Sequence, residues 1–508
     1  MIAASQAWVA THEQNILPET YIEISYGAVD DAAQSVAEAT ATDEAVFSRT
    51  DNVTATTAAQ RYATLERNLW LLNGTRAVLP DDESRNIGYA SQDSDPVSIT
   101  LSFPAVMTNA VPGLTIIWSS EYGEYPKTFT VTVKNGGTVV ATTTVDDNDD
   151  TTSVVNLELV NYDSIVIDAQ DWCLPHHRIR VDTITVGMGI TFTKKDLFSF
   201  THEQEGDLSS GALPKNSVTF SLDNSTGRWN PDNPQGTEKY LSERQKIGVR
   251  YGMGVGGDIE WIDAGTFYLS EWSTPAQGME ATFTARDIFE YLLNEPFPEN
   301  TTGDLKTLVE AAFAAADVPE AFALHLSDVL AEYTGTTDAD RTAAEIVQMC
   351  ANAAGCVIRQ DRVGEMYIEP LNTTESGYTI ARKLSFAHPE ISLSKPLKCV
   401  SVKYGEDTSY TLDAASSGET QTVENPLITT EAQAAMVAET VKAALVSRKT
   451  VSGEFRADPR LDLFDIVVVE SKYGDIYPVV ITNITYSYTG SFWATYTGRV
   501  LGAEVLSL

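Results

Sequence analysis

The chain has 508 residues, of which 43% are hydrophobic and 21% are charged, a composition typical of packed globular proteins and not of disordered ones. Its 34 Lys and Arg residues and 71 Asp and Glu residues give a formal net charge of −37, which argues against nucleic acid and against an anionic membrane surface as the main ligand. A chain of this length is expected to form about three or four domains.

The cysteines and the apolar runs indicate whether the chain is expected to form disulfides, to be exported or to span a membrane. The four cysteines form no C-x-x-C pair and are too few for a disulfide framework, so we expect assembly in a reducing compartment. Residues 1–14 lack the basic and apolar segments of a signal peptide. The longest apolar runs, such as residues 466–469, are much shorter than the ~18 residues that a membrane span needs.

The first part of the chain alternates between a strand pattern and a polar stretch. Apolar and polar residues alternate at residues 21–26, which predicts a strand. Residues 30–61 are rich in Ala, Thr, Asp and Ser, with few large apolar side chains, which predicts a linker. We therefore group residues 1–29 with a later β-rich segment, residues 191–293, as one discontinuous β domain.

Residues 62–190 carry short β-forming runs about every ten residues, a spacing typical of a β-sandwich or jelly roll. Asn135-Gly136, with β-forming residues on both sides, predicts a tight hairpin. The acidic run at residues 146–150 lacks the Gly and Glu that an EF-hand needs at its sixth and twelfth positions, where Thr151 and Leu157 stand. A bare acidic turn is the favoured interpretation, with a weak calcium contact left open.

The remaining three segments differ in the secondary structure that their sequences predict. Residues 191–293 are again β-rich, with a glycine-rich turn expected at residues 252–257. Residues 294–385 combine two helices, behind Asp304 and behind a capping box that begins at Thr342, with a hairpin, and so predict a small α+β domain. Residues 386–508 place strands around one helix behind Thr430, which predicts a small barrel or twisted sheet.

No motif in the chain matches a catalytic or metal-binding arrangement. Thr-His-Glu-Gln occurs at residues 11–14 and 201–204, but both copies lack the second His of a zinc protease, so we interpret them as polar strand edges. Adjacent residues of a strand point to opposite faces, so His176 and His177 are poorly placed to share one metal. The chain has no G-x-S-x-G motif. We therefore expect no catalytic residue, metal or cofactor.

Four aromatic residues stand in or near turns of the predicted sandwich. Aromatic faces stack on the apolar C–H faces of sugar rings, so these residues can form a platform for glycan. The alternative for the two tryptophans is that they belong to the sandwich core, and both interpretations remain open. The candidate glycan-binding residues are Trp118, Tyr122, Tyr125 and Trp172.

A series of turn and strand motifs resembles the phage tail hub proteins. Motifs similar to the first domain of that family are Leu213-Pro214, residues 218–224, Trp229-Asn230-Pro231, Tyr240-Leu241, residues 265–269 and Ala285-Arg286-Asp287. Motifs similar to its closing domain are residues 423–428, residues 455–460, Asp465, Tyr486, Gly490 and Gly498-Arg499. Residues 344–358 resemble its middle domain, so the resemblance covers residues 1–29 and 191–508.

Residues 62–190 resemble a galactose-binding jelly roll inserted into the hub. The motifs that carry this resemblance are Trp70, Leu79-Pro80, residues 113–118, Tyr125-Pro126, residues 172–175 and residues 178–180. The resemblance to both families implies a mainly β fold with α+β parts. Its expected parts are hub β-barrel domains at residues 1–29 plus 191–293 and at 386–508, a small α+β domain at 294–385, and the inserted β-sandwich at 62–190, behind a linker at 30–61.

The hub family implies a homotrimer around the tail axis, at the tail tip or baseplate of a virion assembled in the bacterial cytoplasm. Its expected partners are the distal tail or tail tube protein, the tape measure protein, and fibre or tip proteins, with host-surface polysaccharide as a ligand of the insert. Neither sequence-specific nucleic acid binding nor a membrane span is expected. Two alternatives remain: a carbohydrate-binding adsorption protein that acts through the jelly roll, and a virion-associated cell-wall hydrolase.

Overall fold

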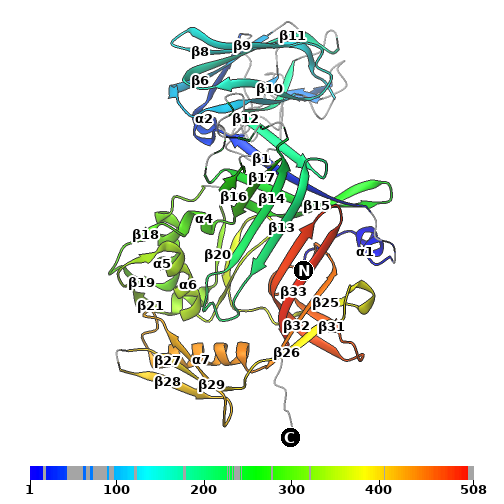
Figure 1. Cartoon of the computed structure of the whole chain (residues 1–508). Coiled ribbons are helices and arrows are strands. Elements are labelled where there is room, and N and C mark those ends of the chain that lie inside the picture. The colour runs from blue at the N-terminus through cyan, green and yellow to red at the C-terminus, as the bar shows by residue number, and fades with distance from the viewer. Residues whose placement is uncertain are drawn as a thin grey trace. The chain divides into compact units, whose positions relative to one another are not determined.

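In the computed structural model the chain is mainly β, which confirms the predicted fold class (Figure 1). The chain divides into two compact units. Unit 1 comprises Met1–Ser25, Thr191–Gly227 and Ser242–Leu508, and unit 2 comprises Tyr26–Ile190 and Arg228–Leu241. The structure describes residues 1–14, 16, 19–42, 61–63, 69–71, 89–90, 97–118, 123–174, 179–225, 227, 229–230, 233, 241, 243–275, 279–319, 322–405 and 407–500.

Unit 2 contains two sheets of antiparallel strands whose apolar side chains share one core. The first sheet has the order β2 (Glu38–Ala41), β6 (Val97–Met107), β11 (Tyr162–Trp172), β8 (Pro126–Asn135) and β9 (Thr138–Val145). The second contains β10 (Thr152–Leu159), β7 (Val111–Trp118) and β12 (Arg180–Thr193), with β5 (Tyr89–Ala90) beside β12. Alternate residues of β8, such as Phe129, Val131 and Val133, are buried, as period-two patterning requires.

Residues 30–61 were expected to form a linker, and for residues 31–41 that prediction is wrong. The Asp30 side chain accepts a hydrogen bond from Ala33 N at 2.9 Å and so caps a short helix, α2 (Asp31–Val36). The strand β2 then pairs with β6. Small and polar residues therefore complete the sandwich through backbone hydrogen bonds, although they supply little apolar surface. Residues 43–60 lie outside the described residues.

The hairpin predicted at Asn135-Gly136 is confirmed. It joins β8 to β9 through Gly136 and Gly137, whose φ angles of 55° and 80° lie in the left-handed region that tight hairpin turns require. The predicted glycine-rich turn at residues 252–257 is shorter than expected. Residues 252–255 belong to β15 (Lys246–Val255), and only Gly256 and Gly257 connect it to β16 (Asp258–Ser273).

Unit 1 joins strands from the two ends of the chain in one sheet. The strand β13 (Leu197–Glu205) pairs on one side with β14 (Lys215–Asp223) and on the other with β32 (Ile476–Tyr488). The sheet runs in the order β15, β16, β17 (Glu280–Arg286), β14, β13, β32, β33 (Phe492–Val500), β30 (Lys449–Arg456) and β26 (Glu390–Leu393). Two further strands, β31 (Ile466–Glu470) and β25 (Glu375–Ile380), extend it from β32.

The α+β part of unit 1 confirms the predicted helices and their caps. Asp304 caps α5 (Leu305–Ala315), and Thr342 with Glu345 forms the predicted capping box of α6 (Ala343–Ala353). The hairpin expected behind α6 is also present, as β23 (Val357–Gln360) paired with β24 (Met366–Glu369). Local cap and turn chemistry was therefore sufficient to locate these elements.

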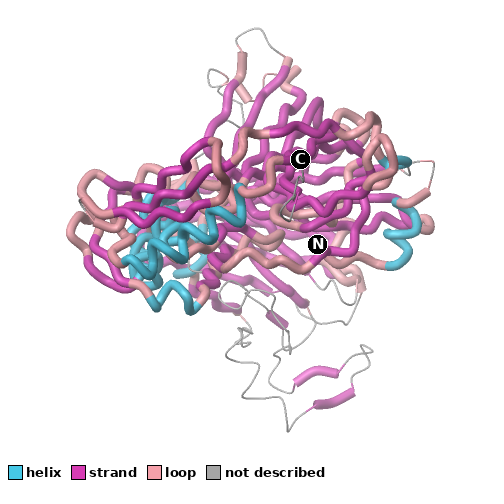
Figure 2. The backbone as a smooth tube through the Cα atoms, turned by 90° about the horizontal axis from the view of Figure 1, so that it is seen from below, coloured by secondary structure: helices cyan, strands magenta, loops and turns pink. Residues whose placement is uncertain are grey.

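The core of this α+β part extends beyond the boundary expected at residue 385. Buried residues of β27 (Leu397–Lys403) and α7 (Glu431–Leu445) belong to the same apolar cluster as those of α5 and α6. These three helices gather on one side of unit 1 (Figure 2). The smaller elements are α1 (Gln6–His12), β1 (Thr20–Val29), β3 (Arg61–Ala63), β4 (Leu69–Leu71), α4 (Phe289–Leu292), β18 (Pro296–Phe297), β19 (Thr302–Asp304), β20 (Leu324–Leu326), η2 (Asp328–Glu332), β21 (Thr334–Thr336), β22 (Arg341–Thr342), η3 (Arg382–Leu384), β28 (Ser409–Asp413) and β29 (Glu419–Glu424).

Candidate functional site

Trp118, one of the predicted glycan-binding residues, is a core residue of unit 2. Its side chain is 0% exposed, and its Nε1 donates to Ser153 Oγ at 2.8 Å. The rings of Phe129 and Trp172 approach it at angles near perpendicular, with centroid distances of 5.2 and 6.1 Å. Because no face of the indole is open to solvent, Trp118 cannot stack on a sugar in this structure, and the core interpretation of this residue is confirmed.

Tyr125 and Trp172 are half-buried neighbours at one end of the same sheet. Cys173 N donates to Tyr125 O at 2.9 Å, which holds the two segments together. Trp172 Nε1 donates to Glu124 Oε2 at 3.1 Å, and Arg180 Nη1 forms an ion pair with the same oxygen at 2.8 Å. The carboxylate therefore fixes the orientation of the Trp172 indole. The fourth candidate, Tyr122, lies outside the described residues, as do His176 and His177.

A second candidate site lies in unit 1, where charged and polar side chains are buried between three segments of the chain. We call this set the polar junction. It consists of His12 on α1, His202 and Asn216 on β13 and β14, Gln360 and Arg362 at the β23–β24 turn, and Asp458, Arg460 and Tyr486 near the C-terminal strands.

Asp458 is fully buried, and its carboxylate is bound by Arg460. Arg460 Nε donates to Asp458 Oδ1 at 2.9 Å, and Nη2 donates to Oδ2 at 2.6 Å. Burial by itself raises the pKa of Asp458, but the hydrogen bonds and charge of Arg460 outweigh it and hold the pKa below its usual value. His12 Nδ1 lies 3.6 Å from Oδ2, and His12 Nε2 lies 2.9 Å from Ala457 O. The helix α1 is therefore fastened to the segment around Asp458.

Arg362 connects the α+β part to both sets of strands. Its Nη2 donates to Leu461 O at 2.7 Å and its Nη1 donates to Ala264 O on β16 at 3.3 Å. Burial disfavours the charge, but Asp462, whose Oδ1 lies 3.6 Å from Arg362 Nε, outweighs that effect and the pKa of Arg362 is raised. Tyr486 Oη lies 2.7 Å from the same Leu461 carbonyl. One carbonyl thus receives donors from two parts of unit 1.

His202 is fully buried in the same region and belongs to a chain of hydrogen bonds that runs from Tyr251 to Gln360. Burial, followed by the nearby charge of Arg362, lowers the pKa of His202 to about 3, so the ring is neutral. Nε2 donates to Asn216 Oδ1 at 2.8 Å, and Nδ1 accepts from Tyr251 Oη at 2.6 Å. Asn216 Nδ2 continues the chain to Gln360 Oε1 at 2.8 Å.

The two Thr-His-Glu-Gln motifs are not polar strand edges, so that interpretation is corrected. His12 is the last residue of α1 and is buried, and His202 lies inside the sheet of unit 1. Gln204, from the second motif, donates from Nε2 to Asp462 Oδ1 at 2.9 Å. The two motifs carry similar residues but occupy a helix and a strand. Both histidines belong to the junction through tertiary contacts. His202 uses both ring nitrogens in hydrogen bonds, whereas His12 uses Nε2 and has its Nδ1 3.6 Å from Asp458 Oδ2.

Asp287, from the Ala285-Arg286-Asp287 motif, is a further buried carboxyl group beside this network. Its Oδ1 accepts from Phe289 N at 3.1 Å at the start of α4, and Asp287 N donates to Asn216 O at 3.0 Å. Burial raises the pKa of Asp287 to about 7, against an opposing effect of Arg286. Near neutral pH this carboxyl group is therefore partly protonated.

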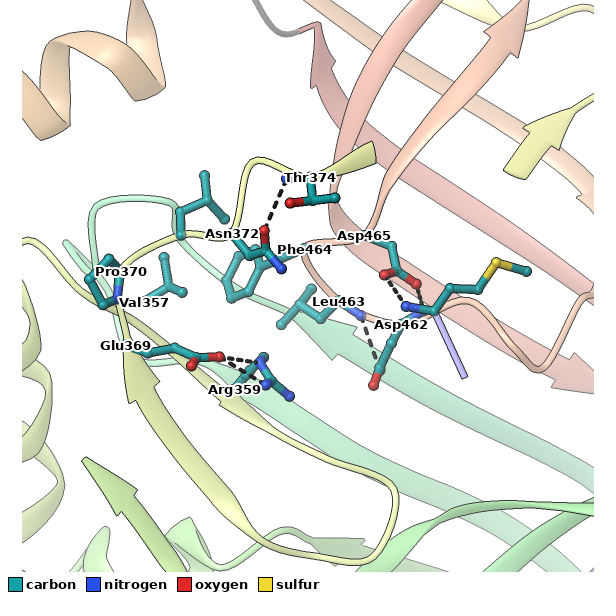
Figure 3. A pocket seen from close by; sticks show the side chains of 12 residues that line it. Val357, Arg359, Glu369, Pro370, Asn372, Thr374, Asp462, Leu463, Phe464 and Asp465 are labelled. Carbon is teal, nitrogen blue, oxygen red and sulfur yellow. Dashed lines mark hydrogen bonds and ion pairs between the residues drawn. The ribbon is translucent and has the colours of Figure 1, made fainter. Parts of the chain in front are cut away.

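A cavity of about 190 Å³ opens beside the junction (Figure 3). Its walls come from β23, β24 and the segments at residues 370–374 and 462–465. Arg359 Nη2 and Glu369 Oε1 form an ion pair at 2.8 Å across it. Leu463 and Phe464 supply the apolar wall. The polar groups drawn in Figure 3 bond to one another, so they present no unpaired cluster to a ligand.

The described residues contain no group of three or more His, Cys, Asp or Glu side chains arranged to hold a metal ion. Three of the four cysteines, Cys350, Cys356 and Cys399, are buried, and burial raises the pKa of Cys356 to about 12. These thiols are not activated as nucleophiles. Over the described ranges, no helix has the length and apolar character to cross a membrane.

The sequence alone did not identify the polar junction. Hydrophobic patterns report apolar burial, so a buried Arg362 or His202 has no signature of its own. In the sequence, residues 455–460, Asp465 and Tyr486 stand out only through their resemblance to the hub family. The signal that was available, two polar Thr-His-Glu-Gln runs, was interpreted as a strand-edge feature.

Comparison with known proteins gives fold-level likenesses at low identity. No family model and no curated protein sequence matches the chain. Among solved structures, the prophage MuSo2 43 kDa tail protein from Shewanella oneidensis is similar with a TM-score of 0.43 and 13% identity, covering 61% of this chain and 94% of that one. The tail protein from Neisseria meningitidis MC58 gives 0.43 and 13%, covering 62% and 94%.

A type VI secretion protein is also similar. The E. coli c3393 protein, a component of that system which exhibits structural similarity to T4 bacteriophage tail proteins gp27 and gp5, gives a TM-score of 0.34 and 12% identity, covering 61% of this chain and 74% of that one. Structures similar to this chain thus include phage tail and type VI secretion proteins. Likenesses this loose do not assign the chain to a family.

Proposed function

We propose that the chain is a structural hub of a phage tail tip or baseplate, assembled as a homotrimer around the tail axis. In this role it joins the tail tube or distal tail protein to the fibre or tip proteins, next to the tape measure protein, and it catalyses no reaction. The proposal starts from the motifs at residues 213–287 and 423–499, which resemble those of the hub family. It implies that the chain is a component of the virion.

The observation that carries the proposal is the overlap between those motifs and the buried polar contacts of unit 1. Asp458, Arg460 and Tyr486 belong to the motifs and to the polar junction. Asn425, from another motif, donates to Met349 O at 2.8 Å and so binds the start of the α7 segment to α6. Buried polar contacts of this kind fix one arrangement of the segments that they join. A part that connects a tube to a tip needs such a fixed arrangement.

Deleting the gene from the phage or prophage that encodes the chain tests this proposal. A hub is needed to build the tail, so we expect heads without complete tails in electron micrographs, with tails restored by complementation. An adsorption protein predicts complete tails that fail to bind cells, and a cell-wall hydrolase predicts complete tails that bind but infect slowly. Either outcome would contradict the structural role.

We also propose that unit 2 binds host-surface glycan through Tyr125 and Trp172. These two residues are half-buried neighbours, and Glu124 holds the Trp172 indole in one orientation. Trp118 is excluded by its burial. Aromatic stacking is worth about 1 kcal/mol per contact, so a single site is expected to be weak and to gain from several copies on one particle.

Glycan-array binding of the full chain tests this second proposal. Tyr125→Ala is expected to lower the signal several-fold, because it removes the half-buried ring that would stack on the sugar. Tyr473→Ala is the matched control, since Tyr473 is an exposed tyrosine in unit 1. Equal binding by wild type and Tyr125→Ala, or no binding to any host polysaccharide, would contradict the proposal that unit 2 binds glycan through Tyr125 and Trp172.

A further inference from the structure

The strand β26 (Glu390–Leu393) lies at an edge of the unit 1 sheet, labelled in Figure 1. Over the described residues it pairs with β30 and with no other strand. All four of its side chains are exposed, so neither face of the strand is covered by a core. An edge strand of this kind offers its backbone to another chain.

The hydrogen-bond pattern shows which residues face the open edge. Ser394 N donates to Arg448 O at 2.9 Å, next to the end of the β26–β30 pair. Residues of an antiparallel strand alternate between bonding to the partner and pointing away from it. Ser392 therefore bonds toward β30, whereas Ile391 and Leu393 direct their N–H and C=O groups to the open side.

The same residues expose apolar surface. Leu393 is 58% exposed and Ile391 is 36% exposed, and both lie on one face of the strand. Phe386, just before the strand, is 61% exposed. Proteins usually protect a solvent-facing edge strand with charged residues along it. Here the single charged residue on β26 is Glu390, so the strand is suited to pairing.

The segments that form and flank this edge strand are rich in basic residues, in an otherwise acidic chain. Residues 382–398 and 448–449 hold six of the 34 Lys and Arg residues, namely Arg382, Lys383, Lys395, Lys398, Arg448 and Lys449. Glu390 is the one acidic residue in these segments, out of 71 in the chain. Two acidic residues from elsewhere contact the segments: Lys395 forms an ion pair with Glu419, and Arg382 N donates to Glu470 Oε2. The edge therefore combines open backbone groups, apolar side chains and positive charge. A second copy of the chain carries a net charge of −37, so a basic edge is expected to attract it.

We propose that the β26 edge is the surface through which one copy of this chain binds the next, by strand addition along Ile391 and Leu393. The basic residues around the edge then face acidic surface of the neighbouring copy. Because the basic edge would meet a different, acidic surface of the neighbouring copy, the contact is of the head-to-tail kind, which forms a ring when its rotation closes. The inference rests on the proposed homotrimer and names the surface that builds it.

Proline substitutions on the full chain test the proposal, with mass photometry as the readout. Leu393→Pro and Ile391→Pro each remove an N–H group that faces the open edge and leave the bonds to β30 in place. We expect wild type to form a trimer and each variant to associate about tenfold more weakly or to remain a monomer. Leu393→Glu, which keeps the backbone and adds negative charge, is expected to weaken association in the same direction.

Thr411→Pro is the matched control. Thr411 lies on β28, an edge strand of another sheet, and Tyr404 N bonds to Thr408 O at 3.1 Å, so by the same alternation the N–H of Thr411 also faces outward. This variant should assemble as wild type does. Trimers that persist in Leu393→Pro and Leu393→Glu would overturn the proposal while leaving the hub itself intact. A wild-type chain that stays monomeric by itself would also overturn the proposal, because one copy then does not bind the next through this edge.

Discussion

Single residues of the polar junction decide how unit 1 is held together. Asp458 is bound by both nitrogens of the Arg460 fork and lies close to His12 on α1. A bidentate contact between charged groups is among the stronger polar contacts, and each partner needs the other because both are buried. Removing one charge leaves the other without compensation.

We therefore expect Asp458→Asn to destabilise unit 1 by about 3 kcal/mol, within the range measured for broken buried ion pairs. The measurement is the urea midpoint of the transition that reports unit 1. Asp328→Asn is the control, since it removes an exposed ion pair with Lys306 and should change the midpoint by well under about 1 kcal/mol. Equal effects of the two substitutions would contradict a structural role for the junction.

Asp287 predicts a pH dependence with a definite sign. Its pKa is raised to about 7 in the folded chain from a usual value of 3.8, so the folded state binds the proton more tightly than the unfolded state. Stability from this group is complete below about pH 4, falls as pH rises, and levels off above about pH 7. Between those limits the change is on the order of 4 kcal/mol.

Asp287→Asn keeps an oxygen for Phe289 N and removes the titration. Relative to wild type, the variant should therefore become more stable as pH rises from 5 to 8, because only wild type then buries a charge. Denaturant midpoints of both proteins at the two pH values measure this. Parallel changes in the two proteins would show that Asp287 does not carry the pH dependence.

Helices and strands with strong local signals were predictable from the sequence. The helices α5 and α6 begin at Asp304 and Thr342 because side-chain oxygens cap their first turns, and the sequence shows this chemistry directly. The short helices α1 and α2 were not expected, since helices of this length depend on tertiary contacts that no local pattern records. The strand β2 was missed for a related reason: it is held by pairing with β6.

The packing of β2 against β6 changes the boundaries of the part that we expect to fold independently. A fragment of residues 26–190 should give one cooperative thermal transition, because it holds both sheets and the core that they share. A fragment of residues 60–190 lacks α2 and β2 and should melt lower. Circular dichroism and amide exchange test both fragments. If the longer fragment is disordered, unit 2 does not fold by itself.

At the scale of the whole molecule, the order of β-rich and α+β segments along the chain was predictable, but the pairing of strands from its two ends was not. The sequence predicts β-rich segments at residues 191–293 and 386–508 separately. That β13 lies between β14 and β32 follows from long-range pairing, which no periodicity encodes. The buried polar junction has the same origin, because His12, Arg362 and Asp458 meet only after the sheet is formed.

Charge sets a further condition on any assembly of this chain. Three copies at −37 each carry about −111, so copies repel one another unless specific contacts offset the repulsion within the screening distance of about 8–10 Å. The basic residues around β26 provide such a contact at one edge. The expected ring is therefore held by a few defined surfaces, with most of the acidic residues directed away from them.

The most direct test of the proposed hub is a cryo-electron microscopy map of the intact particle that carries this chain. The account predicts three copies of unit 1 around the axis at the distal end of the tail, with the β26 edge of each copy against its neighbour. One or two copies in the assembled tail, three copies away from the axis, or a map in which the chain does not occur would contradict it.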